Sequence, residues 1–138
     1  MLAWLRRLAT SKPPAPLTGA PEVRRLKTYS AASGFVYQYF YEGHRPSTRD
    51  GEPGVEYVFA VSADRASYAA VSVLLADATL DRWQRETARE LSSTERYAVA
   101  KLVLFRAFDE GPELPRGSQS VVVQAADLAA IAGQLGFL

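Results

Sequence analysis

The residue types that most often carry acid–base chemistry lie together in one stretch, residues 42–54 (EGHRPSTRDGEPG). It contains His44, the single histidine of the chain, with Arg45, Arg49 and Asp50 close by. An imidazole beside guanidinium and carboxylate groups could transfer protons or bind an anion. Because glycine, proline and charged residues dominate this stretch, we predict a flexible surface loop, in which such residues are most often solvated. We therefore expect neither the fold nor the function to depend strongly on His44.

A second candidate site is the aromatic stretch at residues 35–41 (FVYQYFY), whose composition is typical of a β-strand. Strand alternation places Tyr37, Tyr39 and Tyr41 on one face. If exposed, these rings could stack nucleic-acid bases, but no lysine or arginine lies within the stretch. We therefore predict that this face packs on a core helix and keeps its hydroxyl groups near water.

The composition argues against several classes of function. Sixteen Lys and Arg residues against 15 Asp and Glu residues give a net charge of +1, which favours neither nucleic acid nor a membrane. The absence of cysteine excludes disulfides, thiol nucleophiles and thiolate metal sites, and a single histidine is too few for a typical zinc site. The chain has no P-loop sequence, no GxGxxG after a strand, no GxSxG and no HExxH. We expect no cofactor and no metal, and we favour a non-enzymatic protein over an enzyme.

The element that must organise the fold is a predicted helix at residues 92–111. Ser92 and Glu95 have the spacing of a capping box, and Gly111 is a stop signal. Between them the helix is apolar on two sides, with only Arg96, Lys101 and Arg106 as long polar residues within it. A helix that is apolar on two sides must be covered on two sides, so we predict a buried core helix.

The rest of the chain predicts an α+β fold. It consists of a three- to four-stranded, mainly antiparallel sheet, one face of which is covered by the core helix with two further helices. The predicted strands lie at residues 35–41, 55–62, 68–75 and 119–124, and the further helices at residues 77–90 and 125–135. Residues 24–30 could form a short additional strand before them.

The predicted helix at residues 77–90 is amphipathic. We expect Asp77 to be its N-cap and Leu80 and Trp83 to be buried. Charged residues, among them Arg85 and Arg89, are expected on a solvated face.

Three segments make up the domain organisation. Residues 1–10 form a short amphipathic segment, residues 11–22 a proline-rich linker, and residues 23–138 a single α+β domain. The first segment could lie at a membrane surface, but ten residues make a marginal helix alone. We therefore favour packing of this segment on its own domain or on a neighbouring subunit.

The predicted function is that of a non-enzymatic interaction or accessory subunit in the cytoplasm, acting through protein–protein contacts. The alternatives are a nucleic-acid-associated module using residues 35–41, and a small-ligand binder or enzyme using residues 42–54. We expect a homodimer or a place in a larger complex, because the chain offers more apolar surface than its helices can cover. Nucleic acid is not an expected partner, and peripheral membrane contact through residues 1–8 is not favoured. The expected contact residues are Leu2, Trp4, Leu5, Leu8, Leu128, Ile131 and Leu135.

Overall fold

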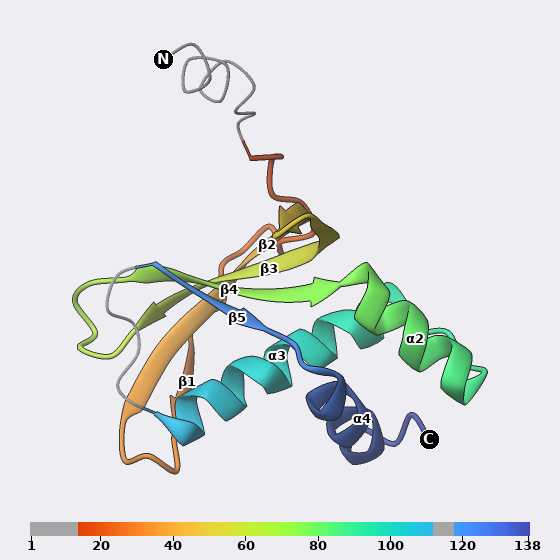
Figure 1. The fold of residues 1–138 in the computed structure, drawn as a ribbon. Helices are drawn as coiled ribbons and strands as arrows, with labels where there is room; N and C mark the ends of the chain where they lie inside the picture. The colour runs from red at the N-terminus through yellow and green to blue at the C-terminus, as the bar shows by residue number, and fades with distance from the viewer. Residues whose placement is uncertain (1–13, 112–117) are drawn as a thin grey trace, which may run out of the picture.

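The computed structural model describes residues 14–111 and 118–138 and confirms the α+β fold. One five-stranded sheet, a strand or two larger than predicted, carries the helices on one face (Figure 1). The strands follow one another in the order β1-β2-β3-β4-β5; the first four are antiparallel neighbours, and β5 pairs parallel with β4. The elements are β1 (Lys27–Ser30), β2 (Val36–Arg49), β3 (Glu52–Ser62), β4 (Ala69–Ala76), α2 (Asp77–Thr87), α3 (Ser93–Glu110), β5 (Gln119–Val122) and α4 (Ala125–Gln134).

The prediction of a flexible loop at residues 42–54 is wrong, because this stretch is a β-hairpin. β2 continues to Arg49, β3 begins at Glu52, and these two residues pair across the turn. Asp50 and Gly51 form the turn with φ of 51° and 80°. A two-residue turn with positive φ at both positions matches the twist of the strands, and Asp-Gly is among the sequences that adopt it most readily.

The glycine and proline residues of this hairpin interrupt the regular ladder only locally. The register shifts between Tyr41 and Gly43, where β2 contains a bulge. Pro46 pairs with Val55, but β1 covers only the first residues of β2, so Pro46 lies where β2 is an edge strand. Proline has no backbone N–H to donate. An edge strand tolerates it because no neighbouring strand on that side requires the missing hydrogen bond.

The inner face of the sheet packs on α3, as predicted. Tyr37 is fully buried and stacks on Phe108 with ring centroids 4.2 Å apart. Tyr29 stacks on Phe105 at 4.3 Å, and Tyr39 is 4% exposed. Tyr37 and Tyr39 are therefore buried in the core, and Tyr41 is half-buried against it, so the tyrosines of β2 present no open platform for stacked bases.

The second apolar side of α3 is covered by α4. Val99 on α3 is fully buried, as are Leu128 and Ile131 on α4, and all three belong to one hydrophobic cluster. We expected Leu128 and Ile131 in a contact between chains, but they fill the core of their own domain, because α3 needs a second covering layer. Leu135 is half-buried against the same cluster.

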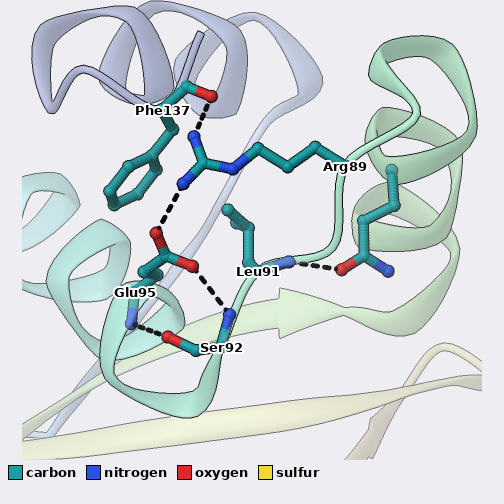
Figure 2. Close-up of polar contacts among 6 residues, drawn as sticks. Arg89, Leu91, Ser92, Glu95 and Phe137 are labelled. Atoms are coloured by element: carbon teal, nitrogen blue, oxygen red, sulfur yellow. Dashed lines mark hydrogen bonds and ion pairs between the residues drawn. The ribbon is translucent and has the colours of Figure 1, made fainter.

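The predicted capping box at the start of α3 is confirmed. Ser92 Oγ accepts a hydrogen bond from the Glu95 N–H at 3.2 Å, and Glu95 accepts one from the Ser92 N–H at 2.9 Å (Figure 2). These two bonds satisfy N–H groups that have no acceptor within the helix. Gly111 ends the helix, also as predicted.

Arg89 does not lie on a solvated face, which corrects the sequence-based expectation. α2 ends at Thr87, and Ala88 turns the chain with a φ of 55°. The guanidinium of Arg89 is then directed to Glu95 on α3, at 2.8 Å, and to the backbone carbonyl of Phe137 (Figure 2). Arg89 thus ties the α2–α3 connection to the segment that follows α4.

The start of α2 also differs from the prediction. Its N-cap is Ala76, without a side-chain cap, and Asp77 lies in the first turn. A carboxylate there still interacts favourably with the helix dipole. Leu80 and Trp83 are buried, as expected.

Replacing Leu104 by Ala should lower the free energy of unfolding by about 2 to 5 kcal/mol, because the side chain is fully buried in α3. Leu26, which is 53% exposed, provides the matched control, and Leu26→Ala should cost less than about 0.5 kcal/mol. Urea denaturation of both variants measures these values. Equal losses in the two variants would contradict the central place of α3.

Stability should depend on pH through Glu95. The hydrogen bond from the Ser92 N–H holds the pKa of Glu95 below its ordinary value of 4.5, and the charge of Arg89 lowers it further. A lowered carboxyl pKa stabilises the fold above the ordinary pKa, and this contribution is lost as the pH falls through the folded-state pKa. Glu95→Gln keeps a side chain that can complete the capping box but removes the charge.

The difference in free energy of unfolding between the wild type and Glu95→Gln should therefore be largest at neutral pH. It should shrink as the pH falls below about 4.5, and denaturation at a series of pH values measures it. The exposed Glu90→Gln variant removes the same charge outside the box and should have a smaller effect. A difference that stays constant down to acid pH would refute this role of Glu95.

Candidate ligand-binding site

A cavity of about 550 Å³ lies between the inner face of the sheet and the first turns of α3. This volume is within the usual range for small-molecule sites. Strands β2 and β3 contribute Tyr39, Tyr41, His44 and Tyr57 to the lining. Helix α3 contributes Ser93, Thr94, Arg96 and Tyr97.

The edge of the cavity beside β1 is formed by the first residue of β1 and by residues that precede this strand in the sequence. Lys27 is the first residue of β1, Arg25 comes just before it, and both line the cavity. Gly19 and Pro21 close it from a segment that we call the strap, residues 14–21. The lining thus combines strands, a helix and the strap, which lie far apart in the sequence.

His44 occupies a packed position in this cavity and is not part of a flexible loop. Its Nδ1 lies 3.0 Å from the Tyr41 hydroxyl, within hydrogen-bonding distance. Its ring centroid lies 5.7 Å from that of Tyr57, the residue opposite it on β3. The imidazole is therefore held on two sides by tyrosines of the sheet.

The strap is attached to β2 at the same residue. Thr18 and His44 exchange two backbone hydrogen bonds of 2.9 Å each, which form an isolated antiparallel bridge. Most side chains of the strap are exposed, as is typical of a connector. Its backbone nevertheless pairs with β2 at one residue, Thr18.

Two glycines allow this close approach. Gly19 has a φ of 81°, and a Cβ at this position would lie 2.6 Å from His44 Cε1. Gly43 has a φ of 120°, and a Cβ there would lie 2.6 Å from the Thr18 carbonyl oxygen. Glycine is the residue that meets both demands, a positive φ and the missing side chain.

Among the described residues, the charged side chains that line the cavity are all cationic: Arg25, Lys27 and Arg96. The Nε of Arg96 is buried and has no hydrogen-bond partner within the described part of the chain. Other arginines of the domain do have acidic partners. These ion pairs are Arg45–Glu56, Arg82–Glu86, Arg89–Glu95 and Arg106–Asp127. The cavity therefore gathers three cationic side chains from two parts of the chain, and none of them forms an ion pair with a carboxylate among the described residues.

The phenol groups in the lining stay protonated at neutral pH. Burial raises the pKa of Tyr39 to about 12, and it raises the pKa of Tyr41 still further. Burial also raises the pKa of Tyr57, although the nearby charge of Arg96 acts in the opposite direction. These hydroxyls are thus able to donate hydrogen bonds.

The structure brings some of the sequence-predicted site residues together and separates others. His44, Tyr39 and Tyr41 line the cavity. Tyr37 is in the core, and Arg45 pairs with Glu56 and donates to the Ala15 carbonyl.

The remaining predicted site residues lie elsewhere. Arg49 and Asp50 are exposed at the tip of the hairpin. Leu2, Trp4, Leu5 and Leu8 lie outside the described residues. Their role in an interface stays a prediction.

Sequence reasoning missed Arg25, Lys27, Tyr57 and Arg96. They come from segments far apart in the chain and meet only through the pairing of β1, β2 and β3 and the crossing of α3. One signal is available, because Arg96 is one of three long cations in a core helix that is apolar on two sides.

Comparisons of the chain with protein-family models, with curated proteins and with solved structures found no match. Within residues 14–111 and 118–138, no group of three or more potential metal ligands occurs. None of the helices in these ranges is long and apolar enough to cross a membrane.

Replacing Gly19 by Ala should detach the strap, because the added Cβ collides with the His44 ring. Gly34→Ala is the matched control, since Gly34 has a φ of 95° but open space around a Cβ. Both variants should lose about 1 kcal/mol of stability from the strained backbone. Only Gly19→Ala should lose amide-exchange protection at Thr18 and His44, measured by NMR. Equal protection in both variants would show that the contact between the strap and His44 does not hold the strap in place.

Proposed function

We propose that this protein binds a small organic acid in the cavity beneath β1, β2 and β3. The observation that carries the proposal is the charge of the lining: Arg25, Lys27 and Arg96 line the space, and no acidic residue of the described part of the chain does. The size of the cavity fits a small molecule, and its aromatic side chains fit an apolar or aromatic body.

Arg96 is the residue that an anionic ligand would stabilise most. A buried guanidinium nitrogen without an acceptor is unfavourable, because it has lost its hydration without gaining a hydrogen bond. A carboxylate or phosphate in the cavity would offset this cost by pairing with the part of the Arg96 guanidinium that lines the cavity, through charge-assisted hydrogen bonds. The Tyr57 ring, close enough to feel the charge of Arg96, would pack beside the same group.

The remaining polar groups would orient the ligand. The protonated hydroxyls of Tyr39 and Tyr41 can donate hydrogen bonds to oxygen atoms. Through its contacts with Tyr41, Tyr57 and Thr18, His44 holds a fixed position at one end of the cavity. This proposal retains the small-ligand alternative raised by the sequence, but assigns it to a cavity rather than to a loop.

An accessory subunit remains a second candidate, favoured by the sheet face opposite the helices. Val36 and Tyr68 are 41% and 40% exposed, and the Tyr68 ring lies 5.8 Å from that of Phe40. The guanidinium of Arg24 lies 4.9 Å from the centroid of the Phe40 ring. Aromatic residues with an arginine are typical of contact surfaces between proteins, so a protein partner or a homodimer remains a proposal alongside ligand binding.

The ligand proposal is tested with para-butylbenzoate and its uncharged amide as matched probes, using titration calorimetry. The benzoate should bind at least about tenfold more tightly than the amide, and Arg96→Gln should remove that difference. Arg85→Gln, an exposed arginine on α2, removes the same charge outside the cavity and should leave binding unchanged. Equal binding of the two probes, or no binding of the benzoate, would contradict the proposal.

A further inference from the structure

The two edges of the sheet are protected to different degrees. β1 and β5 are its outermost strands, and the backbone N–H and C=O groups of an edge strand can pair with another chain. At the first edge, β1 begins with the cationic Lys27, and the part of β2 beyond β1 contains the bulge before Gly43 and also Pro46. The strap covers part of the same edge through the bridge between Thr18 and His44. Lysine, proline, bulges and a covering segment all hinder the addition of a further strand.

The edge at β5 has none of these features. β5 reads QSVV, and its ladder with β4 has no register shift. Residues 118–126 carry no charge, and Asp127, which follows them, forms an ion pair with Arg106 of α3 at 3.6 Å. Within the described part of the chain, no strand pairs with the far side of β5, and Ser120 is exposed there. We call this side of β5 the open edge.

The ladder with β4 shows which backbone groups of β5 point to the open edge. Val122 lies opposite Leu74, and the Val123 N–H donates to the Leu74 carbonyl oxygen at 2.9 Å. Since backbone groups alternate in direction along a strand, the N–H and C=O of Val121 also point toward β4. The N–H and C=O groups of Ser120 and Val122 therefore point away from β4.

This arrangement fits a second copy of the same strand. In an antiparallel pair centred on Val121, Ser120 of one copy would lie opposite Val122 of the other, and the two residues would exchange both of their backbone hydrogen bonds. The two-fold axis would repeat the same pair on the other side of Val121. The two Val121 side chains would then face each other with Cα atoms about 4.5 Å apart, a spacing at which β-branched residues pack well. Because Val121 packs against the hydrophobic core, this contact would extend the core across the pair.

Charge and geometry both favour an identical partner that forms a closed dimer. Two copies of a charged edge would repel each other, but residues 118–126 are uncharged and can face themselves. Antiparallel pairing of β5 with β5 uses the open edge of both copies at once. Since the opposite edge is protected, no further copy can add to the sheet, and the assembly closes as a dimer.

We propose that two copies of this protein associate through the open edge of β5, so that their two sheets join into one. No residue of β5 lines the cavity, so this contact is separate from the proposed ligand site and does not depend on it. It also lies apart from the sheet face that carries Phe40 and Tyr68.

Ser120→Pro tests the proposal, because proline removes an N–H that points to the open edge and leaves the bonds to β4 in place. Ser120→Ala keeps that N–H and is the matched control. In analytical ultracentrifugation, the weight-average mass of the wild type and of Ser120→Ala should rise from 15.1 kDa toward twice this value with increasing concentration. Ser120→Pro should weaken the association at least about tenfold, since each copy loses a hydrogen bond.

Amide exchange of the wild-type protein, measured by NMR, provides an independent test. The N–H groups of Ser120 and Val122 should gain protection as the protein concentration rises. Those of Val121 and Val123, which point toward β4, should be protected at every concentration.

Three results would overturn the proposal. The first is a wild-type protein that stays monomeric up to about 1 mM, a concentration at which even weak pairs associate. The second is a folded Ser120→Pro variant that associates as tightly as Ser120→Ala. The third is a wild-type dimer in which the Ser120 and Val122 N–H groups gain no protection, and this result decides the matter if Ser120→Pro does not fold.

Discussion

The packing of α3 against the aromatic face of the sheet is the interaction on which the rest of this structure depends. The stack of Tyr37 on Phe108 and the contact of Tyr29 with Phe105 fix the helix across β1 and β2. Because α3 is apolar on two sides, a second layer has to form, and Leu128 and Ile131 of α4 provide it. The capping box at Ser92 and the contact from Arg89 then fix where the helix begins.

The cavity follows from the change in side chains along the same helix. Toward the C-terminal half of α3 the large aromatic residues fill the space below the sheet, as Phe108 does. Toward the N-terminal end the lining residues are Ser93, Thr94 and Arg96, which leave space open beneath β2 and β3. The strap closes that space at His44, where two glycines let the backbones approach each other. The helix that builds the core thus also builds one wall of the candidate site.

Much of the fold could be predicted from the sequence, because its main signals are local. Ser92 and Glu95 mark the start of α3 through hydrogen bonds that span three residues, and Gly111 marks its end. The alternation of Tyr37, Tyr39 and Tyr41 predicts a strand with one buried face, and the structure agrees. The hairpin at residues 42–54 is hidden in the composition, because glycine, proline and charged residues are also typical of loops. Asp50-Gly51 sits in a two-residue turn, and Pro46 lies on an open edge, so neither breaks the strands.

The candidate site could be predicted only in part. His44 and Tyr41 are three residues apart and stood out by residue type. Arg25 and Arg96 are separated by most of the domain, and only the strand order and the crossing of α3 bring them to one cavity. Gly19 and Gly43 shape the site because they have no side chain, which lets the strap approach β2. A search of the sequence for chemically reactive residue types does not find them.

The parallel pairing of β5 with β4 has a consequence for how the chain folds as it is synthesised. β1 to β4 form a meander whose contacts are local in sequence, so they can form early. β5 reaches β4 only after α2 and α3 have been made, because both helices lie in the connection between these strands. Until α3 has left the ribosome, α2 can cover only part of β3 and β4, and the aromatic side chains of β1 and β2 have no helix to pack against. Such nascent chains expose apolar surface and an open strand edge, the features that recruit chaperones and lead to aggregation. The rate at which α3 docks on that face therefore sets how long the nascent protein is vulnerable.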